Sequence, residues 1–179
     1  DVFGQALARE ILPILERTSE PAILELGAGS GRLAKSILTA LDDDVSLSPR
    51  YQILEPSADL QERQRSQLAS FGNQVSWCDQ LPADSFEGVI LANEVLDAFP
   101  VTRFVKHADH ARLLGVSHEH GALVWVEGPA DTELNAEVDA LEVLLGYQLP
   151  AGFCSELSRR LPPWITTLAE RLIRGAMLI

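Results

Sequence analysis

Residues 25–31, Glu-Leu-Gly-Ala-Gly-Ser-Gly, decide the fold that this sequence predicts. They follow the apolar run 22–26 and precede a segment in which Leu33, Ile37 and Leu41 recur at helical spacing. A strand that ends in closely spaced glycines and passes directly into a helix brings bare backbone N–H groups and the positive helix end against a ligand. The run therefore predicts a loop that binds a nucleotide-like molecule.

The spacing of the three glycines narrows the class of ligand. Gly27, Gly29 and Gly31 alternate with other residues, whereas the dinucleotide fingerprint requires its third glycine one place later, where Arg32 stands. The Gly-Lys-Ser/Thr ending of a phosphate-binding loop is also missing. A nucleotide without phosphates therefore fits this loop better than NAD, FAD, ATP or GTP, although glycines at this spacing are also typical of a tight turn.

Two acidic residues lie where neighbouring strands are predicted to end. Glu25 comes two residues before the first glycine, where its charge would repel a pyrophosphate but attract the sulfonium and α-amino group of S-adenosylmethionine. Glu55 lies 24 residues beyond Gly31, close to where an acidic side chain binds the ribose hydroxyls in Rossmann-like sheets. The loop and both carboxylates indicate S-adenosyl-L-methionine as the cofactor. The competing interpretation is that both acids are solvated strand ends.

Short apolar runs alternate with amphipathic helices through the first half of the chain. The predicted helices cover 3–15, 33–41 and 57–71, and the predicted strands cover 22–26, 51–54, 75–77 and 88–92. The polar residues 42–49 predict a loop. Parallel strands need crossover connections of a dozen or more residues, so the alternation predicts a doubly wound, Rossmann-like α/β sheet with helices on both faces.

The pattern changes after Pro100. Residues 112–116 and 122–126 flank a Gly-containing loop at 117–121 and predict a β-hairpin. Helical spacing of apolar residues follows over 134–145. A hairpin and a helix inserted after the fourth strand interrupt the α/β alternation.

The last segment returns to the α/β pattern. Helical spacing runs from Trp164 to Leu172, and the apolar run 175–179 predicts a fifth core strand. We therefore expect one domain over residues 1–179 with an insertion at 100–160. Because the chain opens inside a helical pattern and closes on this apolar run, we also expect more protein on both sides.

Composition limits the expected partners and setting. The formal net charge of −12 would repel a phosphate backbone, so we do not expect nucleic acid as a partner. Cys78 and Cys154 lie far apart in the sequence and are typical of reduced thiols in an intracellular protein. No apolar stretch approaches the ~20 residues of a membrane span, and the first residues lack the pattern of a signal peptide. We therefore expect a cytoplasmic location.

Longer motifs resemble those of one methyltransferase family. Residues 25–31, 54–56 (Leu-Glu-Pro) and above all 92–101 (Ala-Asn-Glu-Val-Leu-Asp-Ala-Phe-Pro-Val) look like the MidA-type methyltransferases of bacteria and mitochondria. The resemblance spans most of residues 1–105 and returns at 160–179. It implies a class I methyltransferase fold, truncated in this chain, and S-adenosyl-L-methionine as the cofactor.

The resemblance also implies an activity and a setting. The family is associated with methylation of protein arginine, and its mitochondrial member with assembly of respiratory complex I. We therefore expect an unidentified protein substrate, bound on the side of the 100–160 insertion, and a mitochondrial matrix location for a eukaryotic member. The alternatives are a non-catalytic assembly factor or chaperone that keeps this fold and, less favoured, a NAD-dependent oxidoreductase.

Polar residues after the fourth predicted strand form the candidate active site. Ligands of open α/β sheets bind beyond the carboxyl ends of the strands beside the switch point, so Asn93 is expected at the cofactor. Glu94 and Asp97 would hold an arginine guanidinium by paired hydrogen bonds and orient one nitrogen for methyl transfer. The same three residues would also suit the N-terminus of a helix. Asp79, after the third strand, would contact the adenine amino group or occupy a surface turn.

Histidines and tryptophans invite two further interpretations. The four histidines between residues 107 and 120 straddle the predicted hairpin, and no cysteine or further acid completes a tetrahedral set, so we expect no metal site. Trp77, Trp125 and Trp164 fall within apolar periods. Core packing is therefore expected for all three, and a substrate platform is the alternative.

Overall fold

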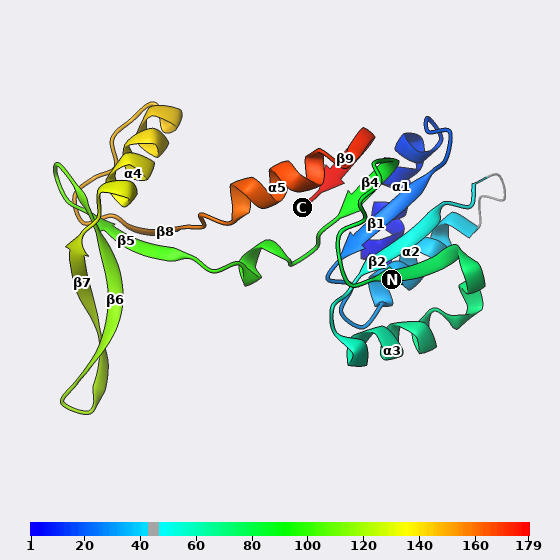
Figure 1. Cartoon of the computed structure of the whole chain (residues 1–179), viewed down its shortest axis with the longest axis horizontal. Helices are drawn as coiled ribbons and strands as arrows, with labels where there is room; N and C mark the ends of the chain where they lie inside the picture. Colours follow the sequence, from blue (N-terminus) through cyan, green and yellow to red (C-terminus); the bar gives the residue numbers. More distant parts are fainter. Residues whose placement is uncertain (43–46) are drawn as a thin grey trace. The chain divides into compact units, whose positions relative to one another are not determined.

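The computed structural model describes residues 1–42 and 47–179. Within these ranges the chain divides into two compact units (Figure 1). The first unit consists of Asp1–Ala98 and Pro163–Ile179, and the second of Phe99–Pro162. The chain expected to form one domain thus divides close to both ends of the predicted insertion, and the inserted segment has a hydrophobic core of its own.

The first unit is built on a parallel sheet with the strand order β3-β2-β1-β4-β9. Its strands are β1 (Ala22–Leu26), β2 (Arg50–Leu54), β3 (Val75–Cys78), β4 (Phe86–Leu91) and β9 (Leu172–Leu178). The central strand β1 is buried along its whole length, as its sequence, apolar at every position except Glu25, favours. The order of the sheet reverses between β1 and β4, which places the switch point at their carboxyl ends.

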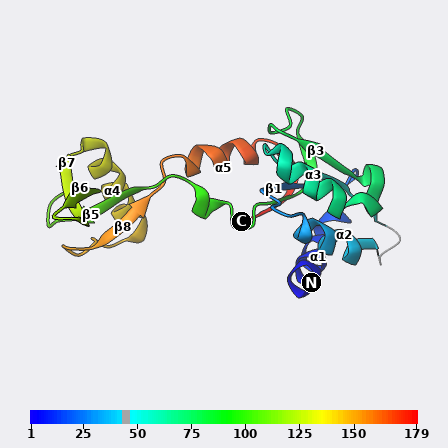
Figure 2. The same ribbon diagram turned by 90° about the horizontal axis from the view of Figure 1, so that it is seen from below.

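Helices cover both faces of this sheet. They are α1 (Val2–Leu15), α2 (Arg32–Asp42), α3 (Ala58–Gln67) and α5 (Leu161–Ala169). Ile23 and Tyr51 pack in one core with residues of α1 and α2, whereas Leu24 and Leu26 pack in another with Leu168 of α5. In Figure 2, α1 and α2 lie on the opposite side of β1 from α5. The predicted doubly wound α/β fold is therefore confirmed. Within the described ranges, no helix is long and apolar enough to cross a membrane.

Two predicted helices end earlier than their apolar spacing suggested. The helix predicted over 57–71 stops at Gln67 and continues as a 3-10 segment, η1 (Ala69–Gln74), in which Gly72 has a φ of +53° and breaks the helical path. Leu172 was expected in the last helix, but it begins β9 and is paired in register with Phe86 of β4. The loop predicted over 42–49 falls partly on residues 43–46, which lie outside the described residues.

The second unit is an antiparallel sheet covered by one helix. The strand order is β7-β6-β5-β8, with β5 (Thr102–Lys106), β6 (Ala111–Glu119), β7 (Ala122–Ala130) and β8 (Cys154–Leu157). The helix α4 (Thr132–Leu145) buries Leu134 and Val138 against Phe104 and Ala111 of the sheet. The hairpin and this helix were predicted, whereas β5 and β8 were not.

The turn of the hairpin is shorter than the predicted loop at 117–121. β6 and β7 remain paired up to Glu119 and Ala122, so only His120 and Gly121 connect them. Both turn residues have positive φ, +49° and +83°, which matches the right-handed twist of paired strands in a two-residue hairpin. The predicted five-residue loop is therefore wrong, because the polar Ser-His-Glu segment belongs to an exposed strand.

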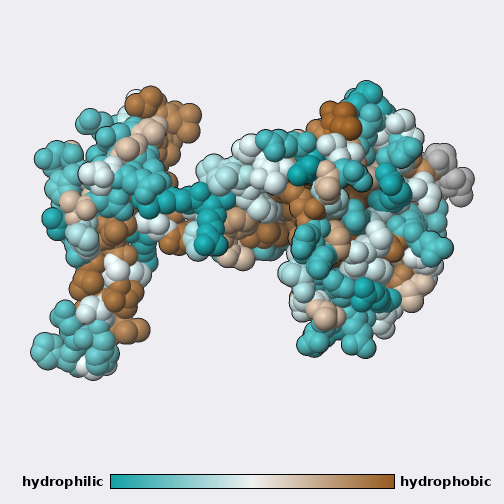
Figure 3. Space-filling view, in the orientation of Figure 1, coloured by the Kyte–Doolittle hydropathy of each residue, from teal (hydrophilic) through white to brown (hydrophobic). Residues whose placement is uncertain are grey.

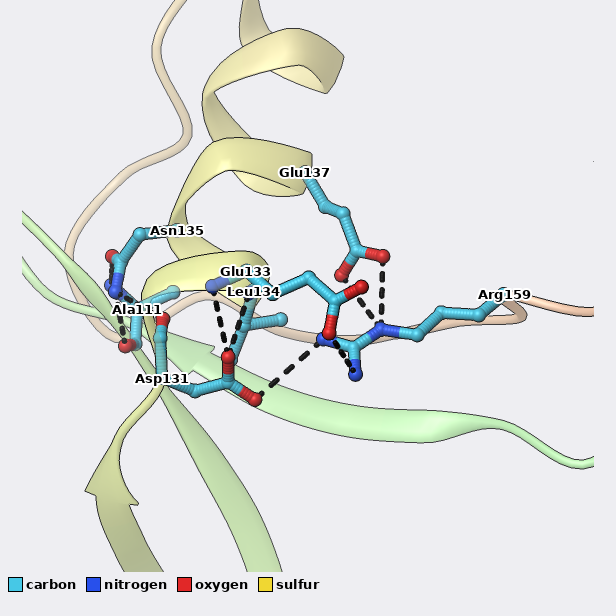
Figure 4. Close-up of polar contacts among 7 residues, drawn as sticks. All are labelled: Ala111, Asp131, Glu133, Leu134, Asn135, Glu137 and Arg159. Carbon is cyan, nitrogen blue, oxygen red and sulfur yellow. Dashed lines mark hydrogen bonds and ion pairs between the residues drawn. The ribbon is translucent and has the colours of Figure 1, made fainter.

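Charged side chains hold α4 on the second unit. Arg159 lies between three carboxylates, with its Nε 2.8 Å from Glu137, its Nη1 3.1 Å from Glu133 and its Nη2 3.6 Å from Asp131 (Figure 4). Asp131 also caps α4, because its Oδ1 accepts the backbone N–H groups of Glu133 and Leu134 at 3.0 Å each. The chain after β8 is thereby tied to the start of α4.

A buried ion pair holds the other end of the same helix. Lys106 Nζ lies 3.2 Å from Glu142 Oε1, and both side chains are almost fully buried. The Leu149 N–H donates to the same carboxylate at 2.8 Å and, with Lys106, keeps the pKa of Glu142 below its usual value. The pair therefore has the additional hydrogen bond that a buried charge requires.

Apolar side chains remain exposed on the second unit. Figure 3 shows hydrophobic surface along the β6–β7 hairpin and at the end of α4. The exposed large residues include Val116 and Leu123 on the hairpin and Val143 and Leu144 on α4. Small domains rarely expose such residues in groups, so these surfaces differ from an ordinary solvated face.

Candidate cofactor site

The loop after β1 has the backbone conformation that its glycines predict. Gly27, Gly29 and Gly31 have φ of +66°, +53° and +79°, a region in which a side chain is strained. The Gly31 N–H donates to the Ala28 carbonyl at 2.8 Å and closes the turn one residue before α2 begins. The direct passage from strand through glycine turn to helix is therefore confirmed.

A cavity of about 450 Å³ lies against this loop. The lining includes the predicted site residues Glu25, Gly27, Gly29, Asn93 and Glu94, together with Ser30 and Arg32. The glycine loop and the segment after β4 thus meet at the carboxyl ends of β1 and β4, where open α/β sheets bind ligands. A second cavity, of about 490 Å³, lies between α1 and α2 and is lined by none of the predicted site residues.

Four other predicted residues do not line the cavity at the glycine loop. The Gly31 N–H closes the turn through its hydrogen bond to the Ala28 carbonyl, and Glu55 lies at the end of β2. Asp79 follows β3, and Asp97 lies in a single 3-10 turn, η2 (Leu96–Ala98). Both aspartates are exposed. The predicted site residues near the ends of β1 and β4 therefore share one cavity, whereas those after β2 and β3 lie outside its lining.

Glu25 is buried, with only 2% of its surface exposed. The buried Tyr51 hydroxyl donates a 2.8 Å hydrogen bond to Glu25 Oε2. Burial raises the pKa of Glu25 to about 7, although the hydrogen bond from Tyr51 opposes this increase. The interpretation of Glu25 as a solvated strand end is therefore wrong, and an approaching cation would favour its ionised form.

Glu55 is also buried, with 4% of its surface exposed, so it is not a solvated strand end either. Its Oε1 accepts the Ser57 N–H at 3.0 Å, and its Oε2 accepts the Gln64 side-chain amide at 3.2 Å. A carboxylate offers about four acceptor positions, so these two bonds leave capacity for a ribose diol.

Gln64 is a residue of the site that sequence reasoning missed. It is fully buried, although most side chains of α3 are charged or polar. Its side chain contacts Gly29, Glu55 and Trp77 through hydrogen bonds. One local signal was present, because Gln64 occupies the middle of the i, i+4, i+8 series between Leu60 and Leu68, which marks the inner face of the helix.

Asn93 and Glu94 form a turn directly after β4. Glu94 has a φ of +54°, which is unusual for a residue with a side chain and costs roughly 1–2 kcal/mol. The helix that was the alternative setting for Asn93, Glu94 and Asp97 is reduced to the three-residue 3-10 turn η2, which contains Asp97. Strained residues concentrate at ligand sites, and Glu94 lines the cavity at the glycine loop.

The predicted core tryptophans divide into two groups. Trp77 and Trp164 are partly buried and pack against the cores of the first unit, as expected. Trp125 is 57% exposed on the hairpin, and the Arg103 guanidinium lies 4.2 Å from the centre of its ring. Core packing is therefore wrong for Trp125, because the hairpin presents this face to solvent.

Two of the four histidines, His107 and His110, lie beside acidic side chains. His107 lies 3.0 Å from Glu127, His110 lies 2.7 Å from Asp109, and the two imidazole rings stack at 4.8 Å. In residues 1–42 and 47–179, no three His, Cys, Asp or Glu side chains are grouped so that they could hold a metal ion.

A family model described as "Putative S-adenosyl-L-methionine-dependent methyltransferase" matches residues 6–179. The chain belongs to this family. The predicted cofactor, S-adenosyl-L-methionine, is the one for which the family is described, and the expectation of a methyltransferase family is confirmed. A search of the curated proteins finds no match.

Two solved structures from Burkholderia thailandensis resemble the chain closely. One, called a "likely methyl transferase" and bound to S-adenosyl-homocysteine, is 35% identical with a TM-score of 0.79, over 97% of this chain and 45% of that one. The other, of the same superfamily, is 33% identical with a TM-score of 0.78, over 97% of this chain and 46% of that one. The predicted methyltransferase fold is therefore confirmed, and the chain spans about half the length of each relative.

Proposed function

We propose that this chain binds S-adenosyl-L-methionine in the cavity at the glycine loop and carries the cofactor-binding half of a methyltransferase. The observation that carries this proposal is the joint lining of one cavity by Glu25, Gly27, Gly29, Asn93 and Glu94. Glycine-loop N–H groups and buried carboxylates suit a ligand with a cationic amino acid end and no phosphates.

Each cofactor residue has a role that follows from its place. Glu25 would attract the α-amino group and the sulfonium. Their positive charge would in turn increase the fraction of Glu25 that is ionised. Glu55, at the end of β2, would accept the ribose hydroxyls. Asn93, which follows β4, would contact the amino acid end of the cofactor. Asp79, which follows β3, would accept a hydrogen bond from the adenine amino group.

The proposed reaction is methylation of a protein arginine. The bound cofactor supplies a methyl group already activated on a sulfonium, so the protein has to align the nucleophile and remove a proton. Glu94 and Asp97 would hold the guanidinium by charge-assisted hydrogen bonds. The positive φ of Glu94 supports this role, because backbone strain is retained where it directs a side chain.

The finer assignments rest on the motif at residues 92–101. Its similarity to MidA-type sequences supports a protein substrate held partly by the second unit, in the cytoplasm or, for a eukaryotic protein, in the mitochondrial matrix. The alternative, an assembly factor that keeps the fold without catalysis, predicts cofactor binding with no methyl transfer.

Cofactor binding and methyl transfer are tested separately. S-adenosylhomocysteine at a hundredfold excess over its Kd should stabilise the protein by about 2.7 kcal/mol in a thermal-shift titration. Labelled cofactor and a native lysate should then give a labelled protein that contains methylarginine on hydrolysis. Absence of stabilisation would refute the proposed function, whereas stabilisation without label would favour the assembly factor.

Glu94→Gln tests the catalytic assignment. Loss of the carboxylate should reduce methyl transfer by roughly 10- to 100-fold while S-adenosylhomocysteine still binds. Glu62→Gln on the exposed face of α3 is the matched control and should retain full transfer. Equal transfer by both variants would remove Glu94 from the mechanism.

A further inference from the structure

Gln64 joins the ends of three neighbouring strands from a helix outside the sheet. Its Nε2 lies 2.8 Å from the carbonyl oxygen of Gly29, in the loop after β1, and 3.2 Å from Oε2 of Glu55, at the end of β2. Its Oε1 lies 2.9 Å from the indole nitrogen of Trp77 in β3. These contacts bridge residues far apart in the sequence.

The partners determine how the amide of Gln64 is oriented. An indole N–H only donates, so the Gln64 oxygen must face Trp77. The two N–H bonds of the amide then face the Gly29 carbonyl and the Glu55 carboxylate, both of which only accept. The amide is therefore fully hydrogen-bonded, and such a buried network is rigid because any rotation leaves polar groups unpaired.

The contact with Gly29 also determines the direction of the next peptide N–H. In a trans peptide the C=O of one residue and the N–H of the next point in opposite directions. When Gln64 holds the Gly29 carbonyl, the Ser30 N–H is turned away from Gln64, and Ser30 lines the cavity at the glycine loop. At Gly31 an added Cβ would lie 3.3 Å from Gln64 Cγ, so the approach of α3 depends on glycine there.

We propose that Gln64 is a positioning residue for the cofactor, holding the Glu55 carboxylate and the Gly29–Ser30 peptide in one fixed arrangement. The inference rests on the proposed function and deepens it, since Gln64 acts through groups that would meet the ribose and the cofactor's amino acid end. Gln64 does not line the cavity at the glycine loop, so it would act on the cofactor only through these groups. Its amide neutralises no charge, so its contribution is orientation.

The test compares Gln64→Met with Gln67→Met in S-adenosylhomocysteine titrations. Methionine has a similar volume but neither donates nor accepts strongly, so Gln64→Met should weaken binding by roughly 10- to 100-fold. Gln67 lies on the same helix and lines the other cavity, so Gln67→Met should bind as the unsubstituted protein does. The indole N–H signal of Trp77 in NMR spectra should shift only in the Gln64 variant.

A double-variant cycle separates positioning from general stability. If Gln64 acts through Glu55, Gln64→Met should weaken binding much less when Glu55→Ala is already present. Additive losses, or unchanged affinity of Gln64→Met, would overturn the positioning role while the proposed function stands. If the unsubstituted protein binds no S-adenosylhomocysteine, both fail together.

A second variant is available should Gln64→Met fold poorly. Trp77→Phe keeps an aromatic ring but removes the donor that orients the amide. It should weaken binding by several-fold, less than Gln64→Met, because both N–H bonds of Gln64 remain. Full affinity in Trp77→Phe would contradict the fixed orientation of the amide.

Discussion

Buried charge is treated differently in the two units. In the first unit Glu25 and Glu55 are buried with neutral partners, a tyrosine hydroxyl and amide N–H groups, and among the described residues neither forms an ion pair. In the second unit the buried Lys106 is paired with Glu142. A buried carboxylate without a cation destabilises the ligand-free state, so the first unit favours a cationic ligand. In the second unit the charges of Lys106 and Glu142 already neutralise each other.

The two sheets also differ in how much space surrounds their glycines. The parallel sheet of the first unit brings backbones into close contact at Gly88 and Gly175, which both have a φ of +146°. A Cβ on Gly175 would overlap the carbonyl oxygen of Gly88. The antiparallel sheet of the second unit leaves Gly115 with open space around its Cβ position. The comparison predicts that substitution of a sheet glycine destabilises the first unit more than the second.

The largest expected effect comes from Gly175→Ala. The new methyl group would force β9 away from β4, so the first unit should lose roughly 3 kcal/mol or more of its free energy of unfolding. Gly115→Ala in β6 is the matched control and should change that free energy by less than about 0.5 kcal/mol. Urea denaturation followed by far-UV circular dichroism measures both. Equal effects would break the comparison between the two sheets.

An intermediate effect is expected from the titration of Glu25. Its pKa is raised from 4.5 to about 7 in the folded protein, so the unfolded chain loses its proton first as the pH increases. The free energy of unfolding therefore decreases by about 3 kcal/mol as the pH increases from 4.5 to about 7. Titration of Glu25 changes it no further at higher pH. Denaturation of the ligand-free protein at a series of pH values measures this slope.

Glu25→Gln is the control for that titration, because it removes the ionising group and keeps the size of the side chain. The variant should show a flatter dependence on pH and be more stable than the unsubstituted protein at pH 8. It should also bind S-adenosylhomocysteine more weakly, since the carboxylate would no longer meet the α-amino group. An unchanged pH slope would show that Glu25 does not titrate in this range.

The smallest expected effect comes from Arg159→Ala. Its carboxylate partners keep 22% (Asp131), 30% (Glu137) and 72% (Glu133) of their side-chain surface exposed, and pairs in contact with solvent are weakened by water and salt. The thermal midpoint of the second unit should decrease slightly, and the difference should vanish at roughly 1 M NaCl. Arg160→Ala, at the adjacent exposed residue, is the control. A decrease that persists in high salt would show that this cluster is more than a surface network.

The fold of the first unit was largely predictable from local pattern. Short, mainly apolar runs specified β1 and β4, because a parallel sheet buries its central strands on both faces, and helical spacing specified α1 and α2. The boundaries after α3 and α5 were less predictable. Over residues 69–71 and at Leu172 the predicted helices would continue, but a 3-10 segment and a strand pairing replace them.

The second unit was predictable only in part. The hairpin and α4 have local signals, whereas β5 and β8 are short strands that become a sheet by pairing with each other across most of the unit. Trp125 shows the same limit, since its apolar neighbours are compatible with both a core and an exposed ribbon. Which face is covered depends on residues distant in the chain.

By itself the sequence determined the glycine loop, the five core strands and the choice of Glu25 and Glu55 as candidate site residues, because these depend on residue types at short spacings. Only the tertiary structure decided that Tyr51 holds Glu25 and that Gln64 joins Gly29 to Glu55. These contacts form when strands separated by whole helices are placed side by side. Burial then determines the protonation of Glu25 and the orientation of Gln64, and no local pattern specifies either.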